Sequence, residues 1–338
     1  MMTVTIKDIA QQAGVSFSTV SKALRNSPLV QESTKRKILL LAEEMGYRPN
    51  TAAQRLVSKK SWAIGVVWPS VERVTPSILI TLINEELEKY NYTTLLSMNK
   101  IESAIDVFNR FQPDAILIFY DRDQSFIEQM PYQTNIPILY YGISGLTPYP
   151  TIDVLRGKAI RLAVKHLTGL GHRRIAYLGD MAHSDLLQKE KIAAYEEEMK
   201  SLDLLPGIVP IQSMESHDGY VAAIKLLASG KRPTAIISGS YDLTRGIIRA
   251  AAELKLDIPK QLSIVSYDHI PQMAELELPI TTVGVEVAEI ARRTAELLVQ
   301  LASKEPDAGI DDHIRLEPVL TERASTCRAD EGDMGSET

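Results

Sequence analysis

The segment AGVSFSTVSKALRN, residues 13–26, places several hydroxyl side chains in one short stretch. They belong to Ser16, Ser18, Thr19 and Ser21. These side chains suit a surface that exchanges hydrogen bonds with DNA base edges and donates them to phosphates, rather than the core side of a helix. Lys22 adds a cation for bases or phosphates, and Phe17 adds an apolar contact suited to the methyl group of thymine. The residue types therefore indicate an exposed surface that forms hydrogen bonds with a partner.

Two short helices are expected to position this segment. Thr5 and Asp8 have the spacing of a capping box, so a first helix should begin after Thr5. Gly14 should end that helix, because glycine tolerates the left-handed conformation of a helix exit. Ser16 is placed to cap a second helix. The apolar stripe of the second helix consists of Val20, Ala23 and Leu24.

A third helix is expected at about residues 31–45, where apolar side chains recur at helical spacing. Two short helices joined by a tight glycine turn, with a third packed across them, form a helix-turn-helix. Such a motif would place the exposed N-terminal part of the second helix in the major groove. The alternative for the same pattern is a small structural helical bundle.

The next stretch, YRPNTAAQRLVSKK at 47–60, favours DNA binding over that alternative. Asn50 can cap a short helix over residues 51–57, which has almost nothing to bury by itself and would be unstable alone. Leu56 is a large apolar residue among basic ones. An apolar wedge beside basic residues is typical of minor-groove insertion, which unstacks a base step and bends the duplex.

Charge is unevenly distributed along the chain. The first 60 residues contain ten Lys or Arg and four Asp or Glu, a net charge of +6, although the whole chain carries −6. A basic module on an acidic body is the pattern of a nucleic-acid binder with a separate regulatory or catalytic part. The alternative explanation is a merely solvated basic face.

The rest of the chain alternates strand-like and helix-like segments. Buried strands are expected at 62–68, 93–98, 115–120, 136–141, 174–179, 207–212, 234–239 and 262–267. Helices are expected between them near 76–90, 101–111, 185–202, 216–230 and 242–255. This order predicts an α/β body with two lobes and two parallel sheets, in which ligands bind at strand carboxyl ends and between the lobes. No phosphate-binding glycine loop follows a strand, so we expect no nucleotide cofactor.

The motifs VTIKDIAQQAGVSFSTVSKALRN and GYRPNTAAQRL resemble the lactose-repressor/galactose-repressor (LacI/GalR) family of bacterial transcription regulators. The likeness continues through LGHRRIAYLG, PTAIISGSYD, LSIVSYDH, LPITTV and IRLEPVLTERAST. It implies a headpiece at 1–48, a hinge helix and linker at 49–60, and a body at 61–330 like periplasmic sugar-binding proteins. The first lobe would comprise about 61–167 and 285–303, and the second about 168–284 and 304–330. An acidic tail at 331–338 is expected to be disordered.

The resemblance implies that two copies of the chain bind a pseudo-palindromic double-stranded operator. It implies that Phe17, Ser18 and Lys22 read bases and that Leu56 is the minor-groove wedge. The candidate DNA-binding residues are Thr5, Ser16, Phe17, Ser18, Thr19, Ser21, Lys22, Asn26, Asn50, Ala53 and Leu56. Lys22 stands where Arg is commoner, and a lysine bonds guanine less rigidly than a bidentate arginine.

The resemblance also places a small effector in the cleft between the lobes. The candidate effector-binding residues are Arg73, Thr75, Leu79, Arg156, Lys191, Met214, Tyr241 and Asp268. Three of them are cations, Arg73, Arg156 and Lys191, which suits an acidic sugar or a sugar phosphate. The alternative is that Arg73 and Arg156 are solvated, or paired with Glu72 or Asp153.

These observations together predict a repressor of a carbohydrate-utilisation operon. The alternative is a regulator of the same fold that responds to a protein partner instead of a metabolite. An enzyme is disfavoured, because the histidines are scattered and neither H-E-x-x-H nor C-x-x-C occurs, which also predicts no metal site. A cytoplasmic location is expected, since Cys327 is the single cysteine, no signal peptide is recognised, and the longest apolar runs are strand-sized.

Overall fold

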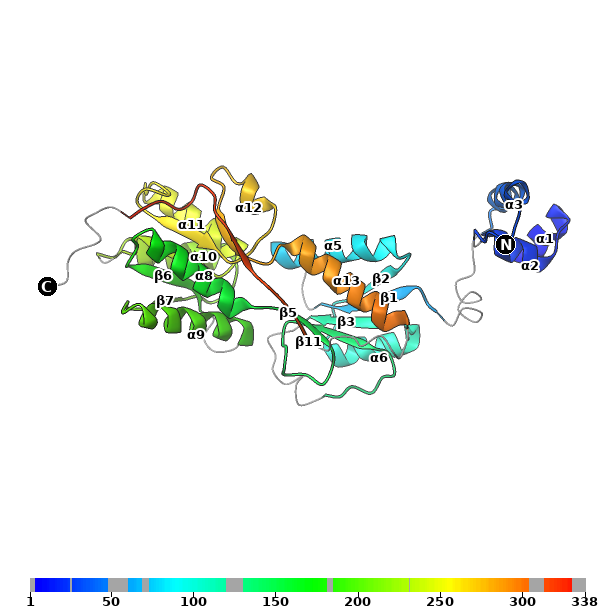
Figure 1. The fold of residues 1–338 in the computed structure, drawn as a ribbon, viewed down its shortest axis with the longest axis horizontal. Helices are drawn as coiled ribbons and strands as arrows, with labels where there is room; N and C mark the ends of the chain where they lie inside the picture. Colours follow the sequence, from blue (N-terminus) through cyan, green and yellow to red (C-terminus); the bar gives the residue numbers. More distant parts are fainter. Residues whose placement is uncertain are drawn as a thin grey trace. The chain divides into compact units, whose positions relative to one another are not determined.

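The computed structural model describes residues 4–24, 26–47, 60–68, 73–119, 130–180, 185–230, 232–303 and 313–329. The chain forms two compact units, Met1–Ser61 and Trp62–Thr338, which are described separately (Figure 1). The first unit contains the headpiece, and the second contains the body. The expected hinge helix at 51–57 lies outside the described residues, as do the expected tail and Glu72.

The headpiece contains three helices, α1 (Ile6–Ala13), α2 (Phe17–Leu24) and α3 (Glu32–Glu44). The Asp8 carboxylate accepts hydrogen bonds from the backbone N–H and the hydroxyl of Thr5, which fixes the start of α1. Gly14 has φ 72° and ends the helix in the left-handed conformation. Buried side chains from all three helices, with Val30 from the segment before α3, form one core. It consists of Ile9, Ala10, Ala13, Val20, Ala23, Val30, Ile38 and Ala42. The predicted helix-turn-helix is confirmed.

The first sheet of the body has the strand order β11-β5-β4-β3-β1-β2, and its neighbouring strands are parallel. The strands are β1 (Ala63–Val67), β2 (Thr93–Ser97), β3 (Ala115–Phe119), β4 (Ile138–Tyr141), β5 (Thr151–Val154) and β11 (His313–Leu316). The central strand β3 is buried at every position, as expected for a strand covered on both faces. Helices α5 (Val74–Lys89), α6 (Ile101–Phe111) and α13 (Val287–Ser303) cover this sheet.

The second sheet has the order β12-β10-β9-β8-β6-β7, in which only the β10–β12 pair is antiparallel. Its strands are β6 (Ile175–Asp180), β7 (Gly207–Pro210), β8 (Ala235–Ser238), β9 (Ser263–Ser266), β10 (Thr281–Gly284) and β12 (Val319–Thr321). Its helices are α8 (Arg156–Gly169), α9 (Leu186–Ser201), α10 (Ser216–Leu227), α11 (Tyr241–Glu253) and the short α12 (Gln272–Glu275).

Two details of the expected lobe division are wrong. Helix α8 packs on α9 and on strands of the second sheet, so the chain enters the second lobe at Leu155 and not near residue 168. The stretch 304–330 was expected to lie wholly in the second lobe, but its described part, 313–329, contributes one strand to each sheet. β11 pairs with β5 in the first sheet, and β12 pairs with β10 in the second. The two strands lie in different sheets because the chain passes from the first lobe to the second at residues 317–318, between β11 and β12.

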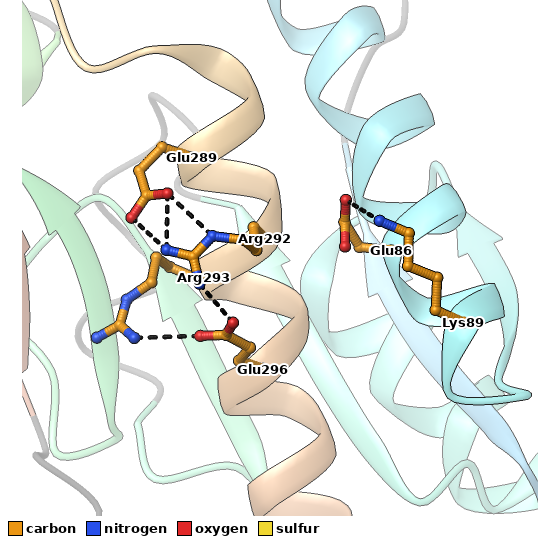
Figure 2. A network of polar contacts seen from close by, with 6 residues as sticks. All are labelled: Glu86, Lys89, Glu289, Arg292, Arg293 and Glu296. Atoms are coloured by element: carbon orange, nitrogen blue, oxygen red, sulfur yellow. Dashed lines mark hydrogen bonds and ion pairs between the residues drawn. The ribbon is translucent and has the colours of Figure 1, made fainter.

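Helix α13 carries a network of charged side chains on its outer face (Figure 2). The Arg292 guanidinium binds Glu289 and Glu296 of its own helix, at N–O distances of 2.7 and 2.5 Å. Arg293 also binds Glu296. Helix α5 lies beside α13 and holds its own pair, Lys89 with Glu86 (Figures 1 and 2). These pairs join neighbouring turns of a helix and stabilise it modestly.

Candidate functional site

Helix α2 is fixed on one side and open on the other. Val20 and Ala23 are buried in the headpiece core. The Ser16 hydroxyl accepts a hydrogen bond from the backbone N–H of Thr19, with N and O 3.2 Å apart, and so caps the helix. The predicted apolar anchor of this helix is confirmed, with Leu24 only half-buried.

The open side of α2 carries the predicted DNA-reading side chains. Phe17 is 52% exposed, and Ser18 and Lys22 are also exposed. The Ser16 hydroxyl lies 2.8 Å from that of Ser18 and 2.9 Å from that of Thr19, so three hydroxyls form one cluster at the start of the helix. Thr19 and Ser21 are half-buried. The surface thus offers one apolar ring, one cation and several hydroxyls that can donate or accept.

Two further candidates already have hydrogen-bond partners inside the headpiece. The hydroxyl of Thr5 donates to Asp8. Asn26, which follows α2 with φ 54°, is exposed, and its side-chain oxygen accepts a hydrogen bond from Lys35 Nζ at 2.7 Å. The lysine was not singled out in the sequence. The three candidates of the linker, Asn50, Ala53 and Leu56, lie outside the described residues.

In the body, the start of α5 meets the start of α11. Asp268, just after β9, accepts a hydrogen bond through Oδ2 from the Thr75 hydroxyl at 2.9 Å. The same oxygen accepts one from the backbone N–H of Tyr241 at 2.7 Å. Thr75 belongs to the first lobe, and the other two residues belong to the second. The structure therefore brings these three predicted residues together across the lobe boundary.

Arg73, also in the first lobe, faces Asp242 of the second, with Nε and Oδ2 4.0 Å apart. The carboxylate of Asp242 also receives a hydrogen bond from the backbone N–H of Val74 at the start of α5. Burial raises the pKa of Asp242, and the positive charge of Arg73 opposes that shift. Arg73 is therefore balanced by a carboxylate in this arrangement.

Lys191 is buried on α9 beneath the predicted site. Its Nζ donates to the backbone oxygen of Gly239 at 3.1 Å and lies 3.4 Å from the ring centroid of Tyr267. Burial lowers the pKa of Lys191 to about 7, while the nearby charge of Asp268 acts in the opposite direction. The ammonium is stabilised by an aromatic ring and a carbonyl oxygen.

Arg156 is buried at the start of α8 and pairs with two carboxylates. Its Nη1 lies 2.5 Å from Asp153 Oδ1 and 3.6 Å from Glu190 Oε2. Burial is the largest single influence on the pKa of Arg156 and would lower it. The nearby groups Asp153, Tyr267, Tyr141 and Glu190 together outweigh burial and raise the pKa above its usual value. The alternative in which Arg156 pairs with Asp153 is confirmed. Arg156 is thus a structural cation at the lobe crossover.

A cavity of about 60 Å³ lies between the lobes. Of the predicted residues, Thr75, Leu79 and Asp268 line it. The other lining residues are Tyr141, Val154, Tyr267, His269, Ile270, Gly284, Val285, Val287 and Ile290. The five remaining candidates do not line the cavity, and Met214, only 1% exposed, is part of the body core.

Among the described residues that line the cavity, Asp268 is the only acid, and none is a lysine or an arginine. Tyr141 and Tyr267, which sequence reasoning missed, stand at or just after the carboxyl ends of β4 and β9. That position was the available signal, because ligands in α/β folds bind beyond strand carboxyl ends. Within the described ranges, no group of three or more potential metal ligands occurs. No helix there has the length and apolar character of a membrane span.

Comparison with known families matches both parts of the chain. Residues 5–50 match the model described as bacterial regulatory proteins, lacI family. Residues 164–326 match the periplasmic binding protein-like domain. The first match corresponds to the headpiece, and the second spans most of the second lobe together with α13 and β11 of the first.

Relatives match the chain over most of its length. The HTH-type transcriptional regulator AglR of Rhizobium meliloti (strain 1021) is 30% identical over 314 residues, covering 88% of each chain. Catabolite control protein A of Priestia megaterium is 26% identical over 312 residues, covering 90% of this chain and 94% of the relative. A crystal structure of the lac repressor dimer bound to operator and the anti-inducer ONPF superposes with a TM-score of 0.83 at 26% identity. It covers 96% of this chain and 100% of the repressor chain.

Proposed function

Because this chain belongs to the LacI family of bacterial DNA-binding transcriptional regulators, we propose that it represses a carbohydrate-utilisation operon. It acts as a homodimer in the cytoplasm, and each of its two headpieces binds one half of a pseudo-palindromic operator. Its activity is regulation of transcription and not catalysis. The relatives support this proposal, since one is a transcriptional regulator and another is a repressor bound to its operator.

The DNA-binding part of this proposal rests on the difference between the two sides of helix α2. Val20 and Ala23 fix the helix to the core, while Phe17, Ser18 and Lys22 stand exposed on its other side. This arrangement leaves the helix free to enter a major groove. The experiment is repeated selection of random duplex DNA by the full chain. We expect one enriched pseudo-palindromic sequence; an unenriched pool would reject the proposal.

For regulation, we propose a small effector that binds between the lobes. The supporting observation is that Thr75 and Leu79 of the first lobe and Asp268 of the second line one cavity. An effector held by both lobes changes their arrangement, because it binds one arrangement better than another. The cavity is smaller than the roughly 300–1,000 Å³ of typical ligand pockets, so binding requires the lobes to separate.

We propose an acidic sugar or a sugar phosphate as this effector. Arg73, whose Nε lies 4.0 Å from Asp242, and Lys191 are held less closely than Arg156, which pairs with Asp153 and Glu190. Neither lines the cavity, so both would reach the effector only after the lobes separate. Calorimetry of the full chain against hexuronates, phosphosugars and neutral sugars tests the class. Tightest binding of an anionic sugar supports it, provided that Lys191→Gln weakens this binding; tightest binding of a neutral sugar rejects it.

A second candidate is regulation by a protein partner. The small cavity favours it, since the described residues enclose too little space for a sugar without movement of the lobes. One relative is named catabolite control protein A. Operator binding that no metabolite changes would support this candidate, whereas a calorimetric signal with one sugar would reject it.

A further inference from the structure

Lys35 is an unusual residue in the headpiece core, because it is a lysine that is only 7% exposed. Its Nζ donates to Asn26 Oδ1 at 2.7 Å and lies 3.2 Å from Glu32 Oε2. Burying an ammonium costs free energy unless it is paired and hydrogen-bonded. A lysine kept at this position must therefore be held by these two partners.

The bond to Asn26 fixes the direction of a side-chain amide. A lysine ammonium can only donate hydrogen bonds, so it binds the side-chain oxygen of Asn26 and not the nitrogen. The side-chain NH₂ group of Asn26 therefore points away from Lys35. Asn26 itself is exposed and lies two residues beyond the end of α2. Its backbone is held as well, since its N–H donates to the backbone oxygen of Ala23 at 3.0 Å. The headpiece therefore presents the amide of Asn26 as a donor.

A donor with a fixed direction beside a DNA-reading helix suits the phosphate backbone. Phosphate oxygens accept hydrogen bonds and do not donate them, and asparagine is among the residues that bind them. We infer that Lys35 is a positioning residue that fixes the Asn26 amide to donate to an operator phosphate. The inference rests on the proposed function, because it needs the headpiece to bind DNA.

The first test uses the full chain and an operator selected from random DNA by the unaltered protein. Asn26→Ala and Lys35→Met should each weaken operator binding about tenfold, because the first removes the hydrogen bond to the phosphate and the second leaves its donor without a fixed direction. The double variant should bind the operator about as tightly as the single variant with the lower affinity, because both changes remove the same contact. Losses that multiply to about a hundredfold would overturn the inference.

The salt dependence of binding separates positioning from direct contact. A lysine that binds a phosphate itself displaces a counterion, so its removal would lower the slope of log affinity against log salt by about 0.9. We expect Lys35→Met to leave this slope unchanged. We expect Lys35→Arg, which keeps a charged donor, to bind the operator with the affinity of the unaltered protein. A lowered slope, or no rescue by arginine, would contradict a positioning role.

Asn26→Asp keeps the test decisive if Lys35→Met does not fold. A carboxylate retains an acceptor for Lys35, so we expect the melting temperature of the headpiece to be unchanged or higher. The same carboxylate would face phosphate, so we expect operator binding to fall by more than the loss with Asn26→Ala. Equal affinities of the Asp and Ala variants would overturn the inference. If the unaltered protein selects no sequence, the proposed function itself fails, whatever the variants do.

Discussion

Thr75 of the first lobe donates its hydroxyl to Asp268 of the second, with the two oxygens 2.9 Å apart. Because the same Asp268 oxygen also binds the backbone N–H of Tyr241, one carboxylate joins the first turns of α5 and α11. The N-terminal ends of helices carry partial positive charge, which a carboxylate between them stabilises. The contact between the lobes is therefore electrostatic and can be exchanged for contacts with a ligand.

Thr75→Val should weaken this contact without changing the size of the side chain. We expect the free energy of unfolding to fall by about 1 kcal/mol, the usual worth of one hydrogen bond. Thr81→Val on the same helix is a matched control, because the Thr81 hydroxyl is exposed and bonds only within α5. Urea denaturation of both variants measures the difference. Equal stability of the two variants would mean that the contact between the lobes contributes nothing.

Arg156→Met should leave Asp153 buried without its cation. Removing one partner of a buried pair typically costs about 3–5 kcal/mol. Lys158→Met, two residues further along α8, removes the exposed partner of Glu317 and should cost at most about 1 kcal/mol. Chemical denaturation compares the two. A similar small loss in both variants would show that the charge of Arg156 is not needed for folding.

Lys191 should make stability depend on pH. Its pKa is lowered from 10.5 to about 7 in the folded chain, so between these values the unfolded chain binds more protons. The contribution of Lys191 to the free energy of unfolding therefore rises as pH increases from 7 towards 10, by on the order of 1 kcal/mol per pH unit. Denaturation of the wild type and Lys191→Met at pH 7, 8 and 9 measures it. If the free energies of unfolding of the two proteins changed equally with pH, burial would not lower the pKa of Lys191.

Gly246→Ala should disrupt the packing of α11 on α10. A Cβ at Gly246 would lie 2.3 Å from the Ser216 backbone oxygen and 2.5 Å from the Tyr220 nitrogen, so the backbones would have to separate. We expect a loss of about 1–3 kcal/mol from overpacking. Gly169→Ala is the control, because a Cβ there meets no atom within 4 Å. Thermal unfolding of both variants tests the expectation, which fails if both melt like the wild type.

The headpiece could be predicted almost completely from the sequence, because local signals define it. Thr5 and Asp8 start α1, Gly14 ends it, and Val20 with Ala23 marks the inner side of α2. These contacts join residues close in sequence. The bond from Lys35 to Asn26 spans two elements and needs a buried lysine, which composition gives no reason to expect.

The body was predicted less completely. Apolar strands such as β3 are recognisable in the sequence as continuous apolar runs. Strand β5 has the sequence TIDV, and its Asp153 can be buried because it pairs with Arg156. The partners of the charged residues between the lobes were harder to predict. Glu190 reaches Arg156 from another helix, and Asp242 of the second lobe faces Arg73 of the first. A list of cations in the sequence cannot show which of them the fold already balances.

The central claim, that α2 reads DNA, is tested most directly through Lys22. Operator affinity of the full chain and of Lys22→Ala would be measured by fluorescence anisotropy on the selected sequence and on every single-base variant of one half-site. We predict that Lys22→Ala costs about 1–3 kcal/mol and removes the preference at one position of the half-site, leaving the other positions unchanged. Equal loss on all sequences, with every base preference retained, would contradict the account.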